Sequence, residues 1–123
     1  MIETKELRIG NWVIYNHGNL FSEDYFREID FITPSVGEKS KPILLTKDIL
    51  EKCGFTQLKS NNEENIFIKD RLKIWLGIRQ SLCFLKDEDK NDCYYISNGG
   101  ISSLNQLQNL YYFLFNKELE VKL

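Results

Sequence analysis

Three residues with chemically useful side chains are spaced along one stretch so that they could act together. Lys73, Trp75 and Arg79 alternate with the apolar positions of the segment Leu72 to Arg79. In a strand, alternate side chains share a face, and Gly77 would leave open backbone between them. Cations beside an indole can stack a nucleic-acid base or clamp a peptide. The alternative, which we favour because tryptophan is usually mostly buried, is that N-terminal strands cover Trp75.

The sequence shows no recognisable catalytic group. His17 is the only histidine of the chain and lies in NHGN, so we expect it in a solvated turn rather than in a triad or a metal site. Serine, threonine or cysteine nucleophiles would need a lysine or carboxylate base, and no segment places one in a known elbow. The prediction is that the protein is not an enzyme.

Two loops carry weaker signals for ligands. Residues 87–92, DEDKND, have oxygen donors at alternate positions, as a calcium loop does, but Asp92 replaces the required glycine and Asn98 the closing glutamate. We interpret this segment as a charged hairpin loop. Gly99 and Gly100 precede a helix without the lysine of a phosphate loop, so a strand-to-helix corner explains them. The sequence predicts neither a metal nor a cofactor.

The composition indicates a single folded domain. The 123 residues are 42% hydrophobic and 28% charged, and 16 basic against 18 acidic side chains give a net charge of -2. This balance argues against a surface built mainly to neutralise phosphates, although it leaves room for a local basic patch. The sequence contains neither an apolar run of membrane length nor a signal peptide at its start, so we expect a cytoplasmic protein that does not enter a membrane. Three cysteines without a two-residue spacing are interpreted as reduced thiols in apolar sites.

The elements that must position these residues follow from hydrophobic periodicity. In the first half, strands are predicted at Trp12–Tyr15 and Asp24–Thr33, with Ile29 and Phe31 on one face and Pro34 ending the second strand. The segment VGEKSK is predicted as a loop. A short helix from about Lys47 to Cys53 follows, with Thr46 as its N-cap and Gly54 after its end.

The second half is predicted as an antiparallel meander followed by a helix. A tight turn near Asp70 joins residues 65–69 to 72–79, and further strands cover 82–86 and 93–97. Ser103 and Gln106 form a capping box, so the helix should begin at Leu104, and Asn116 can end it. Its apolar stripe is Leu104, Leu107, Leu110, Tyr111, Leu114 and Phe115, with Asn105, Gln106 and Asn109 opposite.

Two residues of this helix do not fit the stripe. Gln108 falls inside it, so its amide should bond to backbone at a sheet edge or a helix end. Phe113 falls on the opposite side. We favour the interpretation that N-terminal strands cover Phe113, and a contact with a partner or a second copy is the alternative.

These patterns predict an α+β protein. Its parts are an antiparallel β-meander with the C-terminal helix packed on one face, an N-terminal β-rich piece and a short helix. Residues 1–123 form one domain, in which residues 2–45 could be a β-rich subdomain and residues 46–123 an α+β unit. LRIGNWVIY, residues 7–15, also resembles the first strand of SH3-like small barrels, which open with a hydrophobic-x-x-Gly-Asp/Asn-x-Val pattern.

Three segments together resemble a family of short uncharacterised proteins of anaerobic gut bacteria and their phages. Residues 6–13, ELRIGNWV, are similar to the family's opening ELRIGNxV. Residues 42–55, PILLTKDILEKCGF, are similar to its middle segment PIPLTEEWLLKFGF, and residues 106–111 match the start of its ending QLQNLYFALTGEEL. The resemblance implies a bacterial or prophage setting in the cytoplasm and implies no activity.

Three functions remain open at this point. The first is a non-enzymatic module that binds an unknown protein partner, because no catalytic cluster is visible while Trp75 and Phe113 could face outward. The second is nucleic-acid binding through the barrel-like start and the stripe of Lys73, Trp75 and Arg79. The third is a small enzyme without a recognisable motif. We rank them in this order because of the acidic charge and the missing motifs.

Overall fold

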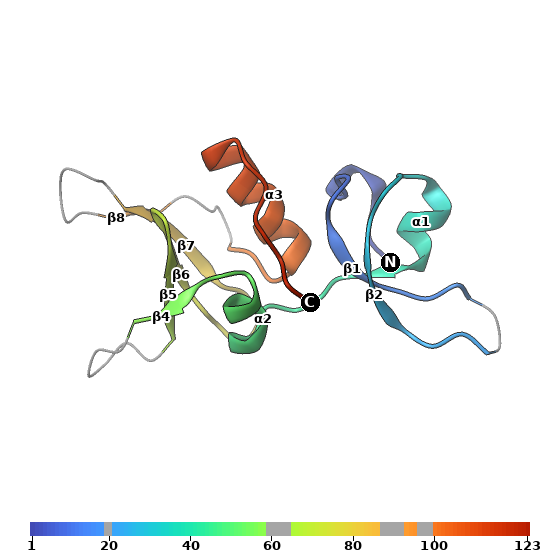
Figure 1. Cartoon of the computed structure of the whole chain (residues 1–123), viewed down its shortest axis with the longest axis horizontal. Coiled ribbons are helices and arrows are strands. Elements are labelled where there is room, and N and C mark those ends of the chain that lie inside the picture. The colour runs from blue at the N-terminus through green and yellow to red at the C-terminus, as the bar shows by residue number, and fades with distance from the viewer. Residues whose placement is uncertain (19–20, 59–64, 87–92, 96–99) are drawn as a thin grey trace. The chain divides into compact units, whose positions relative to one another are not determined.

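A computed structural model of the chain describes residues 1–18, 21–58, 65–86, 93–95 and 100–123 (Figure 1). These residues form two compact units, each of which is described separately below. Unit 1 comprises Met1–Leu44 and Ser103–Glu118, and unit 2 comprises Leu45–Ser102 and Leu119–Leu123. The predicted division, in contrast, kept all of residues 46–123 together.

Unit 1 is a small antiparallel sheet with three helical segments. Strand β1 (Trp12–Tyr15) lies between β2 (Tyr25–Glu28) and the two-residue β3 (Ser40–Lys41). The helical segments are the 3-10 turn η1 (Thr4–Glu6), α1 (Pro34–Lys39) and α3 (Leu104–Phe115). The sheet of the described residues has two open edges, β2 and β3, so it is no closed barrel.

The core of unit 1 forms on one face of this sheet. Val13 and Tyr15 alternate with half-buried residues along β1, as a strand with one covered face requires. A buried cluster joins them to the residues around the sheet, namely Ile2, Leu7, Ile29 and Val36. The predicted bounds of β1 are confirmed. Strand β2 ends at Glu28 and is shorter than the predicted strand Asp24–Thr33. Phe31, expected on the same face as the buried Ile29, lies beyond the end of the strand and is half exposed.

The segment VGEKSK, residues 36–41, was predicted as a loop, which is wrong, because it forms the end of the helix α1 and the strand β3. Thr33 caps the helix, since its Oγ1 accepts a hydrogen bond from Val36 N at 3.2 Å, and proline at the first helical position lacks only an N–H that would stay unpaired there. Gly37 lets the helix approach the N-terminal segment, whose Ile2 N donates to Gly37 O at 3.0 Å. The missed signal is the Thr-Pro pair, which starts a helix as readily as it ends a strand.

Unit 2 is a five-stranded antiparallel meander with one short helix. The helix α2 (Lys47–Lys52) begins where predicted, with Thr46 Oγ1 accepting from Ile49 N at 3.2 Å. The strands follow in the order β4 (Thr56–Gln57), β5 (Ile66–Lys69), β6 (Leu72–Trp75), β7 (Leu82–Lys86) and β8 (Cys93–Tyr95). The tight turn at Asp70 is confirmed by its positive φ of 53°.

Cross-strand register divides the meander into two faces. On one face, four side chains are fully buried, namely Phe67, Leu72, Ile74 and Cys83. Lys69 belongs to this face and donates from Nζ to Cys53 O at 3.0 Å, which places the end of α2 over it (Figure 1). The alternation that predicted a strand as far as Arg79 holds only to Trp75, and Ile78 is fully exposed in the turn that follows.

The C-terminal helix α3 has the predicted bounds. Ser103 N donates to Gln106 Oε1 at 3.3 Å in the capping box, and Asn116 ends the helix with a left-handed φ of 54°. The structure groups this helix with β1 in unit 1, whereas the sequence placed it on the meander. The entry of the helix is tied to unit 1 because Leu104 N donates to Ile43 O at 2.8 Å.

The protein is therefore α+β, as predicted, with two antiparallel sheets and a C-terminal helix. Within the part of the chain that the structure describes, none of the helices has the length and apolar character needed to cross a membrane.

Candidate binding surfaces

The outer face of the five-stranded sheet carries two of the predicted site residues. Lys73 and Trp75 point away from the buried face of unit 2, and Trp75 is 53% exposed. Within unit 2 this ring is therefore uncovered, and the cover by N-terminal strands, which belong to unit 1, stays a prediction. Register places Phe84 directly opposite Lys73, and Leu82 directly opposite Trp75.

Arg79 and Phe113 lie outside this face. Arg79 is exposed in the turn between β6 and β7, so it does not continue the stripe along β6. Phe113 belongs to α3 in unit 1 and is 83% exposed, so the prediction that the N-terminal strands of the same unit cover it is wrong. The four predicted residues are thus distributed over two units, and only Lys73 and Trp75 share a strand.

Strand β2 forms an open edge of the sheet in unit 1. Ile29 N donates to Asn11 O of the neighbouring chain segment at 2.8 Å. Main-chain groups alternate in direction along an antiparallel strand, so those of Arg27 and Tyr25 face β1, whereas those of Phe26 and Glu28 point to the open side. An edge of this kind is a template for a further strand.

A shallow pocket lies beside this edge. It has a volume of 270 Å³ and is lined by Ile14, Asp24, Tyr25 and Phe26. The carboxylate of Asp24 at the pocket is held by Asn16 Nδ2 at 2.8 Å and lies 3.8 Å from Lys41 Nζ. Phe26 is 48% exposed, and its cross-strand neighbour Ile14 is half-buried on the same face. The edge therefore combines unpaired main-chain groups with an apolar hollow and one fixed negative charge.

Large apolar side chains are exposed around this edge. They are Phe21, Tyr25, Phe26, Phe31 and Ile32. Sequence reasoning missed them because it treated the whole segment from Asp24 to Thr33 as one strand with an inward-facing apolar side. The available signal was that aromatic residues occupy both odd and even positions of DYFREIDFIT. In a strand, these positions face opposite sides of the sheet, and a sheet with one covered face buries only one of the two sets.

Side-chain amides of α3 form hydrogen bonds to the chain segment before β1 and to the start of β1. Gln108 is fully buried, with Oε1 accepting from Trp12 N at 2.8 Å and Nε2 donating to Gly10 O at 2.9 Å. This confirms the prediction that its amide bonds to backbone. Asn105 and Asn109 were expected on the outward side, which is wrong, since Asn105 is buried and Asn109 donates to Glu6 O at 3.1 Å.

An arginine extends this amide contact to the surface of unit 1. Arg8 Nε donates to Asn109 Oδ1 at 3.2 Å, and its Nη2 donates to Glu118 Oε2 at 3.1 Å. Its guanidinium carbon lies 4.4 Å from the centre of the Tyr112 ring. The bidentate pair with Glu118 and the contact with the Tyr112 ring hold the last segment of unit 1 against its first segment. We therefore interpret this cluster as one that stabilises the fold.

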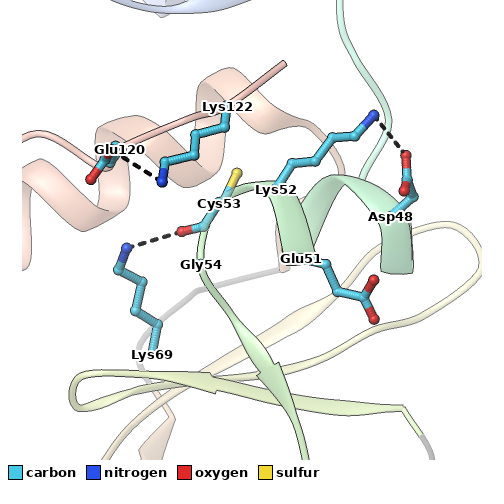
Figure 2. Close-up of a pocket in the computed structure, with 8 residues that line it drawn as sticks. All are labelled: Asp48, Glu51, Lys52, Cys53, Gly54, Lys69, Glu120 and Lys122. Atoms are coloured by element: carbon cyan, nitrogen blue, oxygen red, sulfur yellow. Dashed lines mark hydrogen bonds and ion pairs between the residues drawn. The ribbon is translucent and has the colours of Figure 1, made fainter.

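Figure 2 shows a second pocket, of 410 Å³, at the C-terminal end of α2. Its lining residues are Asp48, Glu51, Lys52, Cys53, Gly54, Lys69, Glu120 and Lys122. Lys52 pairs with Asp48 at 3.1 Å and Lys122 with Glu120 at 3.8 Å, while Lys69 donates to the carbonyl of Cys53. The positive charges of this pocket are therefore compensated by its own lining, and we do not assign it a ligand.

The surroundings of two cysteines and of the histidine indicate how reactive these side chains are. Burial raises the pKa of the Cys53 thiol to about 11, and the charge of Lys69 opposes this shift only in part. Cys53 and Cys83 are buried, as predicted for thiols that fill apolar sites. His17 is exposed and its Nε2 lies 3.2 Å from the hydroxyl of Tyr25. A neutral buried thiol is a poor nucleophile, so Cys53 is unsuited to covalent chemistry.

Of the two loops with weak ligand signals, which were predicted as a charged hairpin loop and a strand-to-helix corner, residues 87–92 and Gly99 lie outside the described residues. Within the described ranges, the structure brings together no group of three histidine, cysteine or carboxylate side chains that could hold a metal.

Comparison of the chain with protein-family models, with curated proteins and with solved structures finds no match. The resemblance to short proteins of gut bacteria and their phages therefore stays a prediction.

Proposed function

We propose that the chain is a non-enzymatic protein-binding module that takes an extended segment of a partner protein at the open edge of β2. The observation that carries this proposal is the outward direction of the main-chain groups of Phe26 and Glu28 at a sheet edge. A segment added there would form ladder hydrogen bonds without any change in the sheet. Main-chain pairing gives affinity with little dependence on sequence.

Selectivity would come from the pocket beside the edge. Because alternate side chains of an added strand point to the same face, one of them would lie over Ile14 and Phe26 and meet the 270 Å³ hollow. An apolar side chain fits this lining, and a lysine or arginine next to it could approach Asp24. The surrounding exposed rings are of the kind enriched at protein contacts.

A binding role is further supported by the state of the described nucleophile candidates. Cys53 is buried with a raised pKa, and exposed His17 contacts the rings of Tyr15 and Tyr25 and the phenol hydroxyl of Tyr25. From the resemblance we extend the proposal to a bacterial or prophage protein that acts in the cytoplasm.

The experiment is a selection from a displayed library of random peptides on the full chain, followed by binding titrations of the selected peptides. We expect extended peptides with an alternating apolar pattern. The variant Phe26→Asp should abolish their binding, because it places a charge at the pocket and a second carboxylate near Asp24. The matched control Phe113→Asp changes an exposed ring on α3 and should leave the affinity unchanged. Peptides that bind Phe26→Asp as well as the unmodified chain would refute the proposal.

A further inference from the structure

The outer face of the meander in unit 2 presents aromatic rings and cations on adjacent strands. Phe84 of β7 lies directly opposite Lys73 of β6, and Trp75 follows two residues further along β6. Phe84 and Trp75 are therefore diagonal neighbours, and side chains at diagonal positions lie roughly 7–8 Å apart. The two rings therefore flank the lysine on one continuous surface, with the indole of Trp75 more than half exposed.

The charge of this face is positive although the whole chain is slightly acidic. Lys73 and Lys86 are its charged positions on β6 and β7, and the one carboxylate of residues 65–86 is Asp70 in the turn. Lys86 continues the outer face along β7, and Arg71 reaches the same end because its Nε donates to Lys86 O at 2.9 Å. The outer-face positions of β4 to β7 that the structure describes carry no carboxylate, and these positions are Thr56, Ile66, Ile68, Lys73, Trp75, Leu82, Phe84 and Lys86.

We propose that this face binds single-stranded nucleic acid. Bases would stack on Trp75 and Phe84, and the phosphates between them would lie near Lys73 and the cationic end formed by Arg71 and Lys86. Aromatic platforms beside cations bind single strands with little sequence preference, because every base has a stacking face. A duplex hides its base faces in the helix, so flat rings on a sheet select unpaired strands. This site lies in unit 2 and does not depend on the proposed function of β2 in unit 1.

The test measures fluorescence anisotropy of a labelled oligothymidine at low salt, titrated with the full chain. We expect binding that weakens as salt rises and that is at least several-fold weaker for a duplex of equal length. Trp75→Ala should lower the affinity roughly tenfold, since stacking contributes about 1–3 kcal/mol per base. Lys73→Ala should reduce the slope of log affinity against log salt by about 0.7, the value for one phosphate contact on a single strand.

Two controls separate this site from nonspecific attraction. Lys47→Ala removes an exposed lysine elsewhere in unit 2 and should leave both affinity and salt slope nearly unchanged. In a Trp12→Phe background, Trp75 is the remaining tryptophan, and oligothymidine should quench its fluorescence. The proposal is overturned by an absence of binding at micromolar protein, by oligothymidine affinity of Trp75→Ala equal to that of the unmodified chain, or by unchanged Trp75 fluorescence at saturating oligothymidine.

Discussion

The side chain of Gln108 completes the hydrogen-bond ladder of Trp12. Strand β3 pairs with β1 only at Ile14 and Tyr15, and beyond that point the amide of Gln108 accepts from Trp12 N and donates to Gly10 O. One side chain of α3 thus supplies the main-chain hydrogen bonds that a longer β3 would form with this part of the chain. The helix is fixed to the sheet of unit 1 by this pair of bonds as well as by apolar packing.

Gln108→Leu should therefore destabilise the protein strongly although leucine suits an apolar stripe. The substitution leaves Trp12 N and Gly10 O unpaired in a buried site, which costs about 1–3 kcal/mol for each group. We expect a loss of roughly 2–4 kcal/mol in the free energy of unfolding, measured by urea denaturation. The same substitution at the exposed Gln106 removes only a capping contact and should cost about 1 kcal/mol or less. Equal effects at the two positions would contradict this role of Gln108.

Gly37→Ala should destabilise the protein, against the usual trend for helices. Alanine in place of glycine normally stabilises a helix interior by roughly 1 kcal/mol. Here the new Cβ would lie 2.7 Å from Ile2 O, a backbone atom held by its own hydrogen-bonded segment. We expect a net loss of about 1–3 kcal/mol in thermal or urea unfolding. The control Ser35→Ala, at an exposed position of the same helix, should have little effect or stabilise slightly, and a stabilising Gly37→Ala would disprove the close approach.

Truncation of Tyr111 should destabilise the protein strongly, whereas truncation of Phe113 should leave its stability nearly unchanged. Tyr111 is 1% exposed, so Tyr111→Ala should cost roughly 3–5 kcal/mol of unfolding free energy. Phe113 is 83% exposed, and Phe113→Ala should change this free energy by no more than about 0.5 kcal/mol. Urea denaturation of both variants provides the measurement. A large loss for Phe113→Ala would mean that its ring is covered after all.

The buried thiol of Cys53 should make stability fall at alkaline pH. Its folded pKa of about 11 exceeds the ordinary value of 9.0, so between these values the unfolded chain releases a proton that the folded chain keeps. The contribution of the group is therefore fully present below pH 9 and lost as pH rises through 11, by roughly 3 kcal/mol in total. The difference in unfolding free energy between the unmodified chain and Cys53→Ala, followed from pH 8 to 11, isolates this titration from those of lysines and tyrosines. A difference that does not change with pH would contradict the shifted pKa.

Local signals made much of the fold predictable. Thr46 and Ser103 start helices where their side chains can cap, and Asp70 marks the turn of the hairpin, because each feature depends on neighbours within four residues. Helix α1 escaped prediction because its six residues are too few for a periodic pattern and include Gly37. The Thr-Pro start was the remaining clue.

Contacts between distant segments were less accessible. The stripe of α3 shows that one side of the helix is packed, but periodicity does not name the partner, and the structure groups the helix with the sheet of unit 1. Asn105 and Asn109 were expected outward because they lie opposite the apolar stripe, whereas here they pair with main-chain and amide groups before β1. The candidate edge at β2 depends on which strand lies outermost, which is set by tertiary pairing rather than by the letters of the strand.

Amide hydrogen exchange at β2 tests the central claim most directly. Phe26 N–H and Glu28 N–H point to the open edge, whereas Arg27 N–H faces β1. Without a ligand, Phe26 and Glu28 should exchange fast and Arg27 slowly. With a saturating selected peptide, Phe26 and Glu28 should become protected by at least an order of magnitude, while residues of unit 2 keep their rates. Unchanged exchange at Phe26 and Glu28 in a peptide complex would show that the partner binds elsewhere.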